Sequence, residues 1–260
     1  MHRKTFTYKN INISFADTGE GSAVILLHGF LENSTMWDSI VPILSKKNRV
    51  ITIDLLGHGN TDNLSYVHTM HDQAKMVKAV LNHLKLRKYI LIGHSLGGYI
   101  ALAFAELFPE NIKKFCLLNS TALPDSKEKK LNRDRAINLV KKNAAIFVGM
   151  AIPNLFTEDS RLKFKNEITF VKKEALKTST QGVIASLEGM KIRKDRTFIL
   201  QNNTFKKLFI LGKKDPLLNR NDLLEQVKNA DVEVIEFSNG HMSHIENLME
   251  LIIVLQEFVK

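Results

Sequence analysis

The sequence predicts an α/β protein with an eight-stranded, mostly parallel, doubly wound sheet and a helical insertion after the sixth strand. Two observations predict this fold. Short apolar or alternating runs of strand length recur along the chain, and from the third run onward amphipathic stretches separate them. Strands that alternate with helices form parallel sheets, because each connection must cross over the sheet. The 260 residues, of which 44% are hydrophobic, suffice for a large core.

Eight runs are predicted to be strands, at 4–8, 11–17, 23–27, 49–54, 89–92, 113–118, 207–211 and 233–237. Only Lys9 and Asn10 separate the first two runs, so we expect a hairpin that makes the amino-terminal edge of the sheet antiparallel. Further amphipathic patterns predict helices at 37–45, 71–84, 97–107, 222–228 and 247–259.

The alternation stops between the sixth and seventh predicted strands. Residues 122–200 are predicted to form a helical lid, with residues 1–121 and 201–260 forming the two parts of the core. Ligands of open parallel sheets bind beyond the carboxyl ends of the strands, and the insertion leaves from such an end, so we expect it to cover the site. Its helical patterns lie at 132–142, 144–150, 160–169 and 172–188.

Composition narrows the classes of function. The chain has no apolar run long enough to span a membrane and begins without an apolar signal core, so we expect a cytoplasmic protein. Cys116, the single cysteine, lies in an apolar run and is expected to be buried and inert. The net charge is +10, and residues 122–200 hold 17 Lys and Arg against 9 Asp and Glu. We interpret this excess as a solvated basic face, with an electrostatic funnel for anionic substrates or an anionic surface as the alternative, and we expect no nucleic-acid partner.

Gly93-His94-Ser95-Leu96-Gly97-Gly98 joins the fifth predicted strand directly to a predicted helix. A serine between glycines at such a corner is typical of a nucleophile elbow, because the tight turn leaves no room for side chains at the flanking positions. Ser95 is therefore expected to stand exposed at the carboxyl end of its strand.

A serine nucleophile needs a base within hydrogen-bond reach and an acid that orients the base. Asp215 follows the seventh predicted strand and His241 follows the eighth, so both are expected at the same edge of the sheet as the serine. We predict Asp215 as the acid and His241 as the base. Asp222 and Asp231 are weaker candidates for the acid, and His244 is predicted to support or cap rather than to act as base.

An acyl-transfer site must also hold an oxyanion, usually with two backbone N–H groups. Leu96 N–H, at the start of the helix after Ser95, and Phe30 N–H, in the turn after the third strand, are the candidates. His28 is expected mainly to bond the backbone of that turn. Apolar residues of the lid are expected to line an acyl pocket, with simple packing as the alternative. Candidates for the pocket are His28, Trp37, His94, Ile146, Phe147, Met150, Leu155 and Phe156.

Five motifs, in this order, together resemble the α/β-hydrolase superfamily: His28-Gly-Phe30 with Trp37, Asp54-Leu-Leu-Gly-His-Gly59, Gly93-His-Ser-Leu-Gly-Gly98, Gly212-Lys-Lys-Asp215 and Gly240-His241. The resemblance covers residues 20–260 except the lid. Among its branches the chain looks like the small capped esterases and the related perhydrolases, lactonases and carbon–carbon bond hydrolases. Haloalkane dehalogenases and epoxide hydrolases of this fold use aspartate at the elbow, so Ser95 argues against both. His94 argues against the menaquinone-pathway synthases, which usually lack a histidine before the serine.

The resemblance implies that Ser95, Asp215 and His241 form a catalytic triad, that Phe30 and Leu96 form the oxyanion hole, and that no cofactor or metal is required. The turn at residues 54–59, with His58, is interpreted as structural. We expect a serine hydrolase, a monomer or homodimer, acting on a carboxylic ester of short or medium acyl chain. Alternatives are a carbon–carbon bond hydrolase, an acyl-CoA thioesterase, and a non-catalytic ligand-binding receptor on the same fold.

Overall fold

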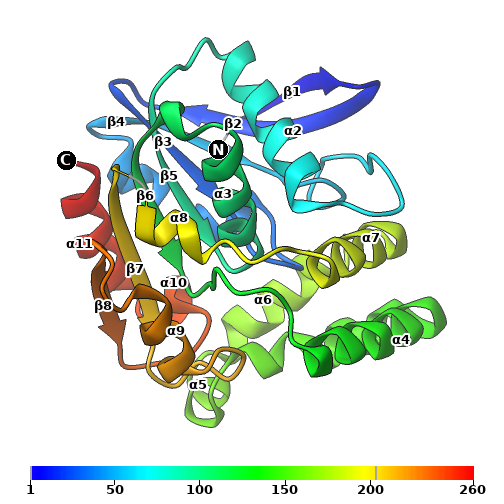
Figure 1. Ribbon diagram of the computed structural model, residues 1–260. Helices are drawn as coiled ribbons and strands as arrows, with labels where there is room; N and C mark the ends of the chain where they lie inside the picture. The colour runs from blue at the N-terminus through cyan, green and yellow to red at the C-terminus, as the bar shows by residue number, and fades with distance from the viewer. Residues whose placement is uncertain (1, 203) are drawn as a thin grey trace.

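The computed structural model describes residues 2–202 and 204–260 and shows a single eight-stranded sheet covered by helices on both faces (Figure 1). The strand order is β1-β2-β4-β3-β5-β6-β7-β8. β1 and β2 form the predicted antiparallel hairpin, β2 also runs antiparallel to β4, and the remaining pairs are parallel. The strands are β1 (Arg3–Tyr8), β2 (Ile11–Thr18), β3 (Ser22–Leu27), β4 (Asn48–Ile53), β5 (Tyr89–His94), β6 (Ile112–Leu118), β7 (Lys206–Gly212) and β8 (Glu233–Phe237).

The two faces of the sheet bury separate apolar clusters because successive strand residues point to opposite sides. In β3, Ile25 and Leu27 join one cluster, and Val24 and Leu26 join the other. The helices α2 (Met70–His83), α3 (Leu96–Leu107), α8 (Thr197–Asn202) and α9 (Arg220–Val227) cover the first face. The helices α1 (Val41–Leu44) and α11 (Leu248–Val259) cover the second.

The eight-stranded, mostly parallel sheet predicted from the sequence is confirmed, but three predicted helices differ. The segment 37–45 is a 3-10 helix, η1 (Ser34–Trp37), followed by the short α1, because Pro42 lacks the N–H that a continuous helix requires. The prediction at 160–169 spans a break at Phe164, whose backbone (φ −109°, ψ 39°) separates two helices. The prediction at 172–188 spans a second break, because the Ser179 side chain accepts from Gly182 N and starts a new helix there.

The insertion between β6 and β7 is helical, and Figure 1 shows α4, α5, α6 and α7 gathered at one end of the sheet. α4 is kinked at Asn143 (φ −161°, ψ 98°), and the Asn143 side chain accepts from Ile146 N as a cap would. Among the residues that the structure describes, no helix is both long and apolar enough to cross a membrane. The helices of the insertion before α8 are α4 (Lys127–Ala151), η3 (Pro153–Leu155), α5 (Glu158–Lys163), α6 (Lys165–Ala175) and α7 (Thr180–Lys191).

Candidate active site

Ser95 occupies a strained turn between β5 and α3. Its backbone has φ 49° and ψ −113°, a region that residues other than glycine rarely adopt. The turn closes only because its neighbours lack side chains. A Cβ on Gly93 would lie 2.3 Å from Gly97 O, and a Cβ on Gly97 would lie 2.3 Å from Leu27 O. The Ser95 side chain is therefore held outward, partly exposed, at the carboxyl end of β5.

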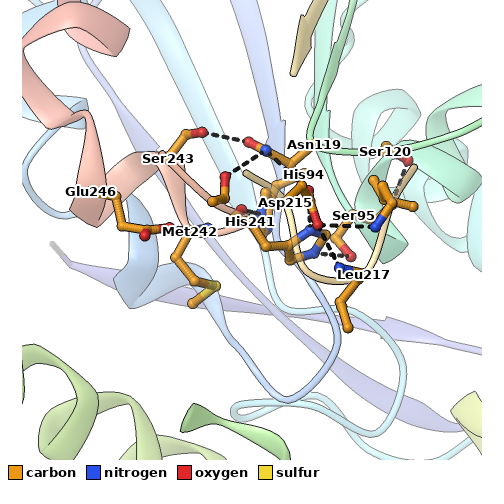
Figure 2. Close-up of polar contacts among 12 residues, drawn as sticks. His94, Ser95, Asn119, Ser120, Asp215, Leu217, His241, Met242, Ser243 and Glu246 are labelled. Atoms are coloured by element: carbon orange, nitrogen blue, oxygen red, sulfur yellow. Dashed lines mark hydrogen bonds and ion pairs between the residues drawn. The ribbon is translucent and has the colours of Figure 1, made fainter. Parts of the chain in front are cut away.

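The structure brings Ser95, His241 and Asp215 into one hydrogen-bonded row (Figure 2). Ser95 Oγ lies 3.0 Å from His241 Nε2, and His241 Nδ1 lies 2.7 Å from Asp215 Oδ2. The three residues follow β5, β8 and β7, strands whose carboxyl ends meet at the same edge of the sheet. A carboxylate that accepts from Nδ1 leaves the unprotonated Nε2 facing the serine hydroxyl, which is the arrangement of a general base.

The side chain of Asp215 is buried and its carboxylate remains ionised. Burial opposes the charge of its carboxylate, but the adjacent His241 ring and the hydrogen bonds it accepts outweigh that penalty and lower its pKa. Leu217 N and Leu218 N donate to Oδ1 at 2.8 and 3.1 Å, while Asn119 Nδ2 lies 3.3 Å from Oδ2. Groups other than the imidazole thus hold both oxygens of the carboxylate in place.

Asn119 is a site residue that the sequence analysis did not identify. It directly follows β6, at the same edge of the sheet as Ser95 and Asp215. Besides approaching Asp215, Asn119 Nδ2 donates to Gly240 O at 3.1 Å, and its Oδ1 accepts from Ser243 Oγ at 2.6 Å. Asn119 therefore ties the acid to both sides of the loop that carries His241 (Figure 2). Its position after a central parallel strand was the available signal.

Two backbone N–H groups point to an oxyanion site. Within the described residues, Leu96 N and Phe30 N donate to no protein acceptor, although the neighbouring amide of Gly29 donates to Glu32 Oε2. Leu96 is the first residue of α3, and Phe30 lines the cavity beside Ser95. Unpaired amides beside a serine nucleophile are the donors that a tetrahedral oxyanion requires.

A buried charge pair lies behind His241. His94 Nδ1 is 2.8 Å from Glu32 Oε2, and His94 Nε2 is 3.0 Å from His241 O. A carboxylate and a carbonyl can only accept, so both His94 nitrogens carry protons and the ring is an imidazolium. Burial alone would lower the pKa of His94, but Glu32 outweighs it and the pKa is raised. The pKa of Glu32 falls to about 2, because the facing histidines outweigh the burial of its carboxylate.

His244, on α10 (Ser243–Glu246), completes this buried cluster. Its Nε2 lies 3.2 Å from Glu32 Oε1. The ligand atoms of Glu32, His94 and His244 lie within 4.8 Å of one another, which is compatible with a metal ion. The two hydrogen bonds of His94, to Glu32 and to His241 O, already account for how these side chains are arranged. His244 lies behind the row containing Ser95, so the structure places it in a supporting position.

Two cavities of about 110 and 300 Å³ adjoin Ser95 and His241. Of the pocket candidates, His94 lines the smaller, Phe147 the larger, and Leu155 both. The other candidates lie elsewhere for identifiable reasons. His28 is fully buried and bonds backbone, accepting from Leu55 N at 2.9 Å.

Trp37 and Phe156 are fully buried in the core, Trp37 on the face of the sheet covered by α1 and α11. Ile146 and Met150 are 52% and 58% exposed, because they lie on the outer side of α4. An apolar residue in an insertion helix can therefore face the cavity, the core or solvent, and the pattern of one helix does not distinguish these.

Comparisons with known proteins agree with the fold. The family model described as alpha/beta hydrolase fold matches residues 22–248. A solved thermophilic esterase from Thermogutta terrifontis, with malate bound, is 29% identical, with 99% of this chain and 97% of that chain covered and a TM-score of 0.92. The enol-lactonase from Burkholderia xenovorans LB400 has a TM-score of 0.91 at 20% identity, covering 98% of this chain and 99% of the other, and so shares the fold.

Among curated proteins, a 2-hydroxy-6-oxononadienedioate/2-hydroxy-6-oxononatrienedioate hydrolase from Escherichia coli is 32% identical over 157 residues, covering 54% of each chain. An uncharacterized protein from Mycobacterium tuberculosis is 34% identical over 107 residues, covering 41% of this chain and 31% of that protein. The matches thus span from a third to about half of these relatives' length. The family model, in contrast, covers most of this chain, which belongs to the α/β-hydrolase fold family.

Proposed function

We propose that the protein is a serine hydrolase that cleaves a carboxylic ester of short or medium acyl chain through an acyl-enzyme intermediate. The observation that carries the proposal is the row from Asp215 through His241 to Ser95, with contacts of 2.7 and 3.0 Å. The likeness to a solved esterase over nearly the whole of both chains supports an ester substrate.

In this mechanism Ser95 Oγ attacks the ester carbonyl while His241 Nε2 takes its proton. Asp215 stabilises the imidazolium that forms, and Phe30 N–H and Leu96 N–H hold the oxyanion. His241 returns the proton to the departing alcohol, and the acyl group remains on Ser95. A water then takes the place of the alcohol, activated by the same imidazole, and releases the acid. Residues 122–200 serve as the lid over this site.

A carbon–carbon bond hydrolase is the second candidate, favoured by the relative from Escherichia coli. The same row of residues would then act on a ketone flanked by an acidic carbon. The choice of substrate distinguishes the two candidates. An esterase hydrolyses 4-nitrophenyl butyrate, whereas a carbon–carbon bond hydrolase preferentially hydrolyses a 2-hydroxy-6-oxo-dienoic acid.

A fluorophosphonate probe tests the serine mechanism directly. We expect it to label the folded protein on Ser95, identified by mass spectrometry of the labelled peptide, and to abolish ester hydrolysis. Ser95→Ala should remain unlabelled. Ser65→Ala, a matched change at an exposed serine whose hydroxyl bonds Val67 O, should label like the parent. Label on other serines alone, with Ser95 unmodified, would contradict the proposal.

A further inference from the structure

The cavities beside Ser95 carry positive charge on one wall. Arg133, on the first half of α4, lines both cavities, and Lys129, one turn earlier, lines the larger. The only acidic side chain among the lining residues described is Glu32, which already faces the His94 imidazolium and accepts from Gly29 N. The rest of the lining is largely apolar, so this charge has no compensating anion inside the cavities.

Arg133 is held by a buried carboxylate that it shares with a second arginine. Its Nε and Nη2 both bond Asp125, whose side chain is fully buried, and Arg193 Nη1 bonds the same carboxylate. Two guanidinium groups facing one carboxylate leave the cluster with a net charge of +1. Arg193 is buried, and its guanidinium also donates to two backbone oxygens, Leu123 O and Met190 O, each at 3.1 Å.

Asp125 leaves one edge of the Arg133 guanidinium unoccupied, and Arg133 lines both cavities. A guanidinium offers two parallel N–H groups on each of its edges, and Asp125 takes the edge formed by Nε and Nη2. Arg133 Nη1 has no hydrogen-bond partner among the residues described. The side chain is 18% exposed, so its charge is weakly screened. Lys129 Nζ adds a second cation, and among the described residues it bonds only Leu217 O, at 3.4 Å.

We propose that Arg133, assisted by Lys129, forms an anion subsite that selects esters carrying a carboxylate on a second part of the molecule. The inference rests on the proposed function and narrows its substrate class. The carboxylate binds the free edge of Arg133 while the apolar walls take the intervening methylenes and Ser95 receives the ester carbonyl. The fixed guanidinium suits this role because Asp125 orients it before the substrate arrives.

Two matched pairs of esters test the subsite on either side of the scissile bond. Mono-4-nitrophenyl adipate is compared with 4-nitrophenyl hexanoate, and 4-carboxyphenyl acetate with phenyl acetate. We expect the parent protein to prefer the carboxylate ester in one pair. In Arg133→Gln the ratio of the two kcat/KM values in that pair should fall by roughly 10- to 100-fold, the range for losing a charged hydrogen bond. The loss should appear mainly in KM.

Arg135→Gln is the matched control, because Arg135 lies on the same helix, is exposed and bonds only Asn132 Oδ1 among the residues described. It should keep the parent ratio. Arg133→Lys keeps the charge but loses the pair of parallel N–H groups, so it should give an intermediate ratio. Lys129→Gln should lower the ratio less than Arg133→Gln does. These ratios are read within each variant, so a variant that folds poorly still reports selectivity.

The outcomes separate the two proposals. If the protein hydrolyses the esters of both pairs and neither kcat/KM ratio changes in Arg133→Gln, the anion subsite is overturned. The proposal of a serine hydrolase would then remain intact. A parent protein that hydrolyses no ester and leaves Ser95 unlabelled by the fluorophosphonate would overturn the proposed function, and the subsite with it.

Discussion

The turns at the carboxyl end of the sheet and the helical insertion above them differ in how their residues are placed. In the turns, glycines and close backbone contacts determine where each side chain points, as at Ser95, where a Cβ on Gly93 or Gly97 would collide with other backbone. In the insertion, the direction of each side chain depends on how a helix packs against the rest. Side-chain direction in the turns thus follows from local backbone geometry, whereas in the insertion it follows from tertiary packing.

Replacing the acid at the base of the row should give the largest effect. Asp215→Asn keeps the size of the side chain but offers an amide where His241 Nδ1–H needs an acceptor, so the imidazole adopts the wrong tautomer. We expect kcat for ester hydrolysis to fall about 10⁴-fold with little change in the melting temperature. A fall of less than tenfold in an active, folded variant would show that the row in Figure 2 is not the catalytic apparatus.

The sequence predicted the strands and the row because each depends on local signals. Gly93-His-Ser-Leu-Gly between a strand and a helix has few conformations available, and Asp215 and His241 each follow an apolar run directly. The insertion was predicted as helical, but its breaks at Phe164 and at residues 176–179 were not, because helical periodicity in a sequence continues across a short non-helical segment.

The polar partners of the row could not be predicted from local patterns. Glu32 meets His94 across 62 positions of sequence, and Asn119 meets Asp215 across 96. No periodicity of the sequence links residues that lie so far apart. Only the strand order of the sheet brings them together.

The buried cluster behind His241 gives the next largest effect, on stability against pH. Burial lowers the pKa of His244 to about 4, so between its unfolded value near 6.5 and pH 4 the unfolded chain binds a proton that the folded chain does not. The free energy of unfolding therefore falls as the pH falls through this window, by about 2 kcal/mol at pH 4.5 for this residue. Burial lowers the pKa of His58 to about 3 and of His68 to about 4, which adds to the same trend.

Urea unfolding at pH 7 and pH 4.5 measures this slope, and His244→Gln assigns it. Glutamine retains a donor that can face Glu32 but does not titrate, so the variant should lose less stability on acidification than the parent. Equal losses in the two proteins would contradict the assignment to His244. On the alkaline side the sign reverses for His94, whose raised pKa makes its contribution complete below pH 6.5 and lost as the pH rises through the folded value.

The smallest expected effect concerns two nearby residues of α4, both of which the sequence predicts to line the acyl pocket. Phe147 lines the larger cavity, whereas Met150, three residues later, is 58% exposed. Phe147→Ala should raise KM for a medium-chain ester several-fold, because it removes apolar surface from the substrate pocket. Met150→Ser should change kcat/KM by less than about twofold and the free energy of unfolding by no more than about 0.5 kcal/mol. Steady-state kinetics with 4-nitrophenyl hexanoate compares the two variants, and a loss in Met150→Ser as large as that in Phe147→Ala would mean that the insertion closes over the substrate with this face of α4 turned inward.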